Sequence, residues 1–179
     1  MPRAASSIRN RARKIKLLLL DLDGVLTDGG IVIDGTGDEL KRFDVRDGHG
    51  IRLLQRAGIR LGIISGRSAK AARHRARDLD VELFFQGVDD KLAVYEKIKR
   101  MTKLTDQEIA YIGDDMVDLP VLRRVGLAVA IGDGWEDLKR HTHYTTRLAG
   151  GRGAVREVIE LLLKSQSKWK EVTAKYYRF

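Results

Sequence analysis

Two carboxylates stand directly after a run of four leucines near the start of the chain. The run Leu17–Leu20 is apolar without interruption, which is typical of a strand buried on both faces in the middle of a parallel sheet. Asp21 and Asp23 follow where that strand would emerge, and a spacing of two places them on the same side of an extended chain. Two like charges this close are unfavourable unless a cation or a proton relieves them. The pair therefore indicates a functional site, although a bare pair of aspartates is more often an acidic turn.

Further polar groups follow other apolar segments or open helices, namely Ser65, Lys91, Asp114, Asp115 and Asp118. Ligands of open α/β sheets bind beyond the carboxyl ends of the strands, where these residues are expected. Each has an ordinary alternative: a turn serine, a helix-surface lysine, and acids favoured by a helix dipole. Their joint occurrence in this order favours one site over three unrelated explanations.

Alternating strands and helices must hold these residues in place. Strands are expected at 17–20, 59–64, 81–85, 109–112, 127–131 and, shorter, 143–145, and helices at 51–57, 68–79, from 89 onward, after Asp118 with Pro120 in the first turn, and at 154–163. Elements of this length in alternation imply right-handed βαβ units. The predicted fold class is therefore α/β, a three-layer sandwich around a doubly wound, mainly parallel sheet.

The segment between the first strand and the first helix carries two further predictions. Asp34-Gly35, between an apolar and an alternating run, indicates a protruding β-hairpin over 29–43. A two-stranded hairpin is marginal alone, so it must lie on the body or pair with another subunit. The polar segment 44–50, which holds Gly48 and His49, is expected to be a loop that leads into the following helix.

Net charge and composition bound the remaining possibilities. The chain has 179 residues, a net charge of +9, 43% hydrophobic residues and no cysteine, which suits one domain without disulfides and fits a reducing cytoplasm. Residues 1–16 carry +6 and residues 164–179 carry +4, which leaves −1 for the body. The excess charge therefore lies in the tails and does not indicate a nucleic-acid partner, and the apolar runs are too short for a membrane span.

We expect three parts of the chain: a basic, solvated N-terminal tail at 1–15, a catalytic domain at 16–163 that includes the hairpin, and a basic and aromatic C-terminal tail at 164–179. The C-terminal aromatic residues are costly to expose at a free end: Trp169, Tyr176, Tyr177 and Phe179. This tail is expected to dock, either over a neighbouring subunit's active site or on its own body.

The order DxDG, a Ser after the second core strand, a single Lys and GDxxxD resembles the haloacid dehalogenase superfamily of phosphohydrolases. The resemblance implies that Asp21 attacks phosphorus and forms an aspartyl-phosphate, and that Asp23 serves the leaving group and the hydrolytic water as acid and base. It implies that Ser65 and Lys91 hold the phosphoryl oxygens. Such a reaction needs charge neutralisation, because an anionic nucleophile approaches an anionic phosphate.

The metal site implied by the same resemblance consists of Asp21, Asp114 and the backbone carbonyl of Asp23. Hard oxygen ligands of this kind suit Mg²⁺. Asp115 and Asp118 are implied as supporting residues, with Asp118 as an orienter of Lys91 or of the metal shell.

The intervals 23–65 and 65–91 leave no room for the large caps of the superfamily, so the chain resembles its capless group. Within that group it resembles the family of phosphatases that act on the sugar-acid phosphate 3-deoxy-D-manno-octulosonate 8-phosphate in lipopolysaccharide biosynthesis, over 21–29, 43–52, 64–67, 111–115 and 149–158. That family implies a homotetramer in which hairpins pair and a neighbour supplies the missing cap. It also implies contacts with the sugar acid or its phosphate from Asp44, Val45, Arg46, Asp47, Gly48, Arg52, Arg67, Arg75 and Lys91.

Three alternatives stay open at this stage. A related phosphatase could act on another sugar-acid phosphate, such as a nine-carbon ulosonate 9-phosphate, since the motifs do not separate the two. A phospho-receiver domain also carries acids, a hydroxyl and a lysine, but its accepting aspartate follows a later strand, where this chain has Ser65 or Gln86. A non-catalytic oligomerisation domain is disfavoured by the intact Asp21 and Asp23.

Overall fold

Six parallel strands form the central sheet in the order β5-β4-β1-β6-β7-β8. The structure is a computed structural model that describes residues 2–177. Its strands are β1 (Leu17–Leu20), β2 (Val32–Ile33), β3 (Glu39–Leu40), β4 (Arg60–Ile64), β5 (Leu83–Phe85), β6 (Ile109–Gly113), β7 (Leu127–Ala130) and β8 (Tyr144–Thr145). Its α-helices are α1 (Pro2–Ala12), α2 (Val45–Arg56), α3 (Lys70–Asp78), α4 (Lys91–Thr102), α5 (Leu119–Leu122), α6 (Glu136–Lys139), α7 (Ala154–Ser165) and α8 (Trp169–Thr173), with 3₁₀ turns η1 (Asp106–Glu108), η2 (Met116–Asp118) and η3 (Ala174–Tyr177).

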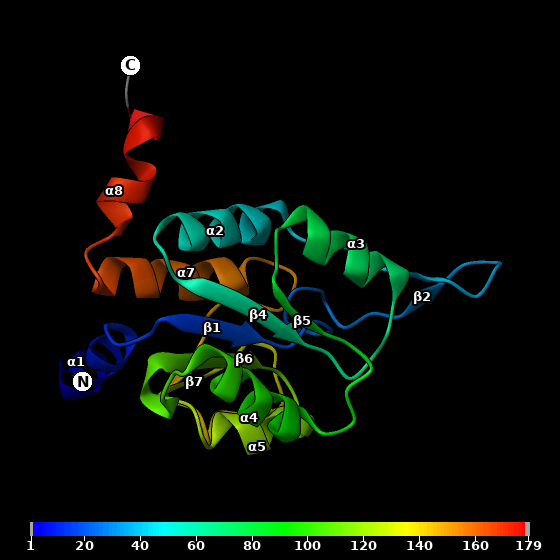
Figure 1. Cartoon of the computed structure of the whole chain (residues 1–179), viewed down its shortest axis with the longest axis horizontal. Coiled ribbons are helices and arrows are strands. Elements are labelled where there is room, and N and C mark those ends of the chain that lie inside the picture. Colours follow the sequence, from blue (N-terminus) through cyan, green and yellow to red (C-terminus); the bar gives the residue numbers. More distant parts are fainter. Residues whose placement is uncertain (1, 178–179) are drawn as a thin grey trace.

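Helices cover both faces of this sheet (Figure 1). The first core lies between the sheet and α1, α2, α3 and α7, and the second lies between the sheet and α4, α5 and α6. Successive leucines of β1 alternate between them, with Leu18 and Leu20 in the first core and Leu17 and Leu19 in the second, all at 0% exposure. The run of four leucines is therefore a central strand buried on both faces, and the predicted α/β sandwich is confirmed.

The predicted hairpin is also confirmed. Strands β2 and β3 pair antiparallel, with Val32 opposite Leu40 and Ile33 opposite Glu39, and the hairpin projects from the sheet at one side of the molecule (Figure 1). Ile31, Val32, Ile33 and Leu40 are each more than half exposed. The strands of the hairpin thus present an exposed apolar surface, Ile31, Val32, Ile33 and Leu40, beside a polar turn at 34–38.

The segment 44–50 is not the loop that its composition predicted. Helix α2 begins at Val45, and the Asp44 carboxylate caps it by accepting from the backbone N–H of Arg46 at 2.7 Å. Its glycines serve close packing: a Cβ at Gly48 would lie 2.3 Å from Arg75 Nη2, and one at Gly50 would lie 2.9 Å from Arg156 Cδ. The glycines were misleading because their neighbours come from distant parts of the chain.

The N-terminal stretch differs from the solvated tail that its charge predicted. Residues 2–12 form α1, which packs on α7 and β7, and Ala12 and Ile15 are buried in the first core. Arg11 Nη1 donates to the carbonyl of Gly126 at 2.8 Å. The few apolar residues within this basic stretch are therefore enough to pack α1 against the body.

None of the helices within residues 2–177 has the length and apolar character that a bilayer crossing requires.

The C-terminal tail docks on its own body, one of the two predicted alternatives. Helix α8 packs against α2 and α7, at the end of the molecule away from the hairpin (Figure 1). Arg156 and Lys164 lie over the Trp169 ring, with 5.3 and 5.0 Å to its centroid. The Tyr176 hydroxyl lies 2.8 Å from His49 Nε2 and accepts from Arg56 at 3.0 Å. Trp169 and Tyr176 thus find cationic partners on α7 and α2, whereas Tyr177 is 71% exposed and Phe179 lies outside the described residues.

Candidate active site

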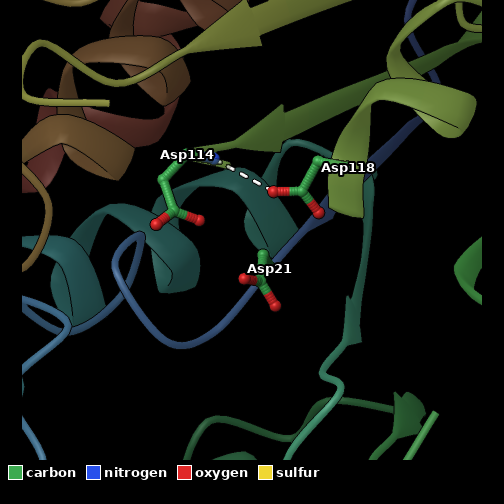
Figure 2. A group of neighbouring side chains, drawn as sticks. All are labelled: Asp21, Asp114 and Asp118. Atoms are coloured by element: carbon green, nitrogen blue, oxygen red, sulfur yellow. Dashed lines mark hydrogen bonds between the residues drawn. The ribbon is translucent and has the colours of Figure 1, made fainter. Parts of the chain in front are cut away.

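Three carboxylates meet where β1 and β6 end (Figure 2). Asp21 follows β1, Asp114 follows β6 and Asp118 closes the turn η2, and one oxygen from each lies within 4.8 Å of the others. Parallel neighbours bring their carboxyl ends to one edge of the sheet, so the pairing of β1 with β6 accounts for this meeting. The three acids of two separate motifs form one cluster.

The electrostatics of the cluster suit a cation. Burial and then the charge of Asp21 raise the pKa of Asp114 to about 8, and burial and then the charge of Asp118 raise the pKa of Asp21 to about 6. The carboxylates of Asp21 and Asp114 supply hard oxygen ligands, and Asp23, whose backbone carbonyl is the third implied ligand, follows Asp21 by two residues. A divalent cation of the Mg²⁺ type would relieve the repulsion, so these residues fit the metal that the motifs imply.

Asp118 is occupied by other partners and is less available to a metal. Its Oδ1 accepts from Lys91 Nζ at 2.7 Å and from the Tyr111 hydroxyl at 2.7 Å. Its Oδ2 accepts from the backbone N–H of Asp114 at 3.0 Å and from that of Asp115 at 3.5 Å. These four contacts fit a residue that orients Lys91 and the loop that carries Asp114.

Lys91 lies between the acids and points into the site from the first turn of α4. Its ammonium pairs with Asp21 Oδ1 at 3.0 Å as well as with Asp118, and the side chain is 5% exposed. Burial alone would lower the pKa of Lys91, but the charges of Asp118 and Asp21 outweigh it and raise that pKa. The lysine is therefore a fixed positive charge beside the predicted nucleophile.

Ser65 and Asp23 complete the group. Ser65 is buried at the end of β4, where its hydroxyl accepts from the backbone N–H of Arg67 at 3.2 Å and has two acceptors in reach, the Arg67 carbonyl at 3.1 Å and Asp23 Oδ2 at 3.4 Å. Asp23 Oδ1 is held by Lys41, a residue outside all of the sequence motifs. A lysine at the end of a hairpin carries no local signal for a contact 18 residues back along the chain.

Gly24 allows the turn after Asp23 to approach the second acidic motif. It adopts φ +88°, and a Cβ there would lie 2.1 Å from Asp114 Oδ2. On the other side, a Cβ at Gly150 would lie 1.6 Å from the carbonyl oxygen of Gly24. The turn that follows Asp21, the predicted nucleophile, and Asp23, the predicted acid and base, is thus packed between Asp114 and the loop before α7.

The residues expected to contact a sugar are distributed unevenly. Asp44, Val45, Arg46, Asp47 and Gly48 form the capping residue and the first turn of α2. Val45 is 79% exposed, and Arg46 pairs with Asp44 at 2.7 Å. Asp47 is buried and accepts from the backbone N–H groups of Gly153 at 3.2 Å and Arg156 at 2.7 Å. Both oxygens of the Asp47 carboxylate therefore bind the start of α7. A ligand at this turn of α2 would contact the residues next to Asp47 and not Asp47 itself.

Three arginines expected to bind substrate occupy different places. Arg67 follows Ser65 and pairs with Glu39 of the hairpin. Arg75 lies beside Gly48 and pairs with Asp78 at 2.6 Å. Arg52 pairs with Asp80, which lies just before β5 begins, at the opposite edge of the sheet from Asp21. Within one chain the structure brings Arg67 to the site and leaves Arg52 away from it.

A family model described as haloacid dehalogenase-like hydrolase matches residues 81–159. The 3-deoxy-D-manno-octulosonate 8-phosphate phosphatase of Yersinia pestis is 45% identical over 169 residues, which is 94% of this chain and 90% of that protein.

Solved structures show the same likeness. The 3-deoxy-D-manno-octulosonate 8-phosphate phosphatase of Moraxella catarrhalis, in complex with a magnesium ion, a phosphate ion and a KDO molecule, superposes with a TM-score of 0.93 at 38% identity, over 96% of this chain and 98% of that one. The cobalt-bound deoxy-D-mannose-octulosonate 8-phosphate phosphatase of Haemophilus influenzae superposes with a TM-score of 0.87 at 36% identity, over 92% and 97% of the two chains.

Proposed function

We propose that this chain, which belongs to the haloacid dehalogenase-like hydrolases and, within them, to the family of the 3-deoxy-D-manno-octulosonate 8-phosphate phosphatases, hydrolyses that sugar-acid phosphate to the free sugar acid and phosphate. The observation that carries the proposal is the convergence of Asp21, Asp114 and Lys91 within contact distance at one sheet edge. The lysine and the metal-type carboxylate cluster supply the charges that a phosphate monoester requires.

In the first half-reaction, an oxygen of Asp21 bonds to phosphorus while the bond from phosphorus to the sugar oxygen breaks. Asp23 gives its proton to that leaving oxygen. Ser65 and Lys91 donate hydrogen bonds to the phosphoryl oxygens. Mg²⁺, held by Asp21, Asp114 and the Asp23 carbonyl, supplies positive charge against the phosphoryl group when bound.

In the second half-reaction, Asp23 takes a proton from water, and the water oxygen bonds to the phosphorus of the aspartyl-phosphate. The bond between phosphorus and Asp21 breaks, which frees the nucleophile and inorganic phosphate. Asp118 keeps Lys91 in place through both steps, because its Oδ1 lies 2.7 Å from the ammonium. Asp115 supports the same loop as the residue that caps η2.

Recognition of the sugar acid is assigned to the exposed residues beside this cluster. Val45 and Arg46 are exposed at the start of α2, where the buried Gly48 makes room for Arg75, and Arg67 stands next to Ser65. An arginine can grip a carboxylate through two parallel hydrogen bonds, which suits a sugar acid. Asp44 and Asp47 support this surface by capping α2 and α7.

The assembly that we propose is a homotetramer in which hairpins pair and neighbours close the open sites. The support is the exposed apolar surface of the hairpin at Ile31, Val32 and Ile33, since such a surface on a strand edge is a place for pairing. In that arrangement Arg52 and Arg75 would serve a neighbouring subunit's site. We expect the reaction to take place in the cytoplasm, as part of lipopolysaccharide biosynthesis, and the absence of cysteine is compatible with that compartment.

The test is phosphate release from a panel of esters with Mg²⁺: 3-deoxy-D-manno-octulosonate 8-phosphate, a nine-carbon ulosonate 9-phosphate and a small generic ester. We expect the highest kcat/KM on the first. Asp21→Asn should abolish turnover while the fold is kept, because an amide cannot attack phosphorus. Substantial activity in that variant would overturn the mechanism, and a preference for the nine-carbon ester would replace the substrate.

A further inference from the structure

Lys41 is an ion-pairing side chain of the hairpin that reaches the active site. It follows β3, its side chain is only 3% exposed, and its ammonium holds Asp23 Oδ1. A buried ammonium is costly unless it is paired. Lys41 therefore has a fixed position, and that position is on the proposed acid–base residue.

The contacts of Lys41 close a ring of side chains. Its Nζ also lies 3.1 Å from Glu39 Oε2, and Glu39 Oε1 accepts from Arg67. The backbone N–H of Arg67 donates to Ser65 Oγ at 3.2 Å, and that oxygen lies 3.4 Å from Asp23 Oδ2 and 3.1 Å from the Arg67 carbonyl. The ring contains two acidic side chains, Asp23 and Glu39, and two basic ones, Lys41 and Arg67. Its formal charges therefore balance when all four are ionised. The hydrogen bond from Arg67, and then that from Lys41, hold the pKa of Glu39 below its usual range and keep it ionised.

We infer that Lys41 is a positioning residue for Asp23, which it reaches from the hairpin, with Glu39 and Arg67 holding Lys41 in turn. The inference rests on the proposed function, because it assigns Lys41 a part in that reaction. One Asp23 oxygen is taken by Lys41, and the other is turned toward Ser65 on the phosphoryl side. Asp23 thus presents Oδ2 as the oxygen that carries the proton in transit.

The same contacts connect the hairpin to the chemistry. The hairpin has its exposed apolar residues at 31–33, on the first strand, and its buried cation at Lys41, just after the second. A shift of the hairpin would therefore move the partner of Asp23. The hairpin thereby contributes to the proton transfer as well as to the surface between subunits.

Leaving-group dependence separates positioning of an acid from general loss of structure. Departure of a sugar or glycerol oxygen needs a proton from Asp23, whereas p-nitrophenolate leaves without one. The ratio kcat/KM reports the steps up to the first irreversible one, which is transfer to Asp21 for both esters. Impaired positioning should therefore lower kcat/KM for the alkyl ester more than for the aryl ester.

The experiment compares glycerol phosphate with p-nitrophenyl phosphate in the full-length protein with Mg²⁺. Lys41→Met keeps the length of the side chain and removes its charge. We expect kcat/KM for glycerol phosphate to fall about 10- to 100-fold and that for p-nitrophenyl phosphate to fall less than about threefold. Lys41→Arg should recover part of the loss. Lys70→Met is the matched control, because Lys70 also ties the hairpin, through Asp38 at 2.8 Å, but is 77% exposed.

Glu39→Gln is a second variant that reaches the same contact if Lys41→Met does not fold. It removes the charge that holds Lys41, so the same leaving-group bias should follow at smaller size, about 3- to 10-fold. Equal losses on both esters, no loss in either variant, or the same bias in Lys70→Met would each overturn the inference. Asp23→Asn serves as the reference variant, because it should show the full leaving-group bias expected when the acid itself is lost. Neither of these esters is a sugar-acid phosphate. The proposed substrate is therefore tested by a different measurement, phosphate release from the panel that includes the sugar-acid phosphates.

Discussion

The hydroxyl of Tyr111 offers a test of the link between Asp118 and Lys91. Tyr111 lies on β6 with its side chain fully buried, and its hydroxyl donates to Asp118 Oδ1 at 2.7 Å. The same oxygen accepts from Lys91 Nζ at 2.7 Å. Burial raises the pKa of Tyr111 well above its usual value, so the hydroxyl stays a donor at every working pH. Tyr111→Phe removes that donor and leaves the ring in place.

The size of the effect follows from the burial of both partners. A hydrogen bond to a charged group contributes about 1.5–3 kcal/mol, and Asp118 is 0% exposed, so water cannot replace the lost donor. The unfolding equilibrium should shift by roughly 10- to 100-fold, and the melting temperature should fall by about 3–12 °C for a chain of this size. Because Lys91 loses part of its fixation, we expect a measurable fall in kcat of about two- to tenfold.

Urea unfolding and steady-state kinetics measure the two effects. Tyr95→Phe is the matched control, since the Tyr95 hydroxyl donates to Asp106 Oδ1 at 2.5 Å and not to the cluster around Lys91. It should lose stability and keep kcat. A Tyr111→Phe protein within about 0.5 kcal/mol of wild type, with unchanged kcat, would refute the role assigned to Asp118.

Three further predictions concern the metal, the hairpin and the tail. Excess chelator should abolish activity, Mg²⁺ should restore it and Ca²⁺ should inhibit, because Ca²⁺ takes more ligands at longer distances; full activity in chelator would contradict the site. Aspartates at Ile31 and Ile33 should reduce the mass in solution and lower sugar-acid selectivity more than activity on a small ester; a selective monomer would contradict the assembly. Burial, and then the charges of Arg156, Arg56 and Lys175, lower the pKa of His49 below 6.5, so its contribution to folding is present above pH 6.5 and is lost as the pH falls through the folded-state pKa. Trp169 fluorescence in a Trp135→Phe background should report a loosened tail at low pH, and His49→Gln should remove that dependence; a pH-independent signal in the parent would contradict it.

The sequence predicted the arrangement of the sheet because the relevant signals are local. Apolar runs at β1, β4, β6 and β7 mark buried parallel strands, and a polar residue directly after a strand lies at its carboxyl end. The order of motifs along the chain was therefore enough to bring Asp21, Ser65 and Asp114 to one edge. It was also enough to exclude a receiver domain, because β4 ends next to Ser65.

The features that could not be predicted depend on partners far along the chain. The glycines of 44–50 indicated a loop, yet they accommodate Arg75 and Arg156, which no local pattern places there. Lys41 resembled any polar residue of an exposed hairpin until the fold placed it against Asp23. The high positive charge of residues 2–12 likewise gave no indication of α1, because the docking of this helix depends on the few apolar positions that contact α7.

The beginning of α7 joins the two parts of the site that a substrate would meet. The Asp47 carboxylate accepts from backbone N–H groups at the first turn of α7, so the start of α2 is bound to that turn. Gly150, in the loop just before, leaves no room for a side chain against Gly24. Close packing at Gly150 and the contact of the Gly153 N–H with Asp47 therefore account for two glycines of this loop. Displacement of α7 would disturb both the turn that follows Asp23 and the surface proposed for the sugar acid.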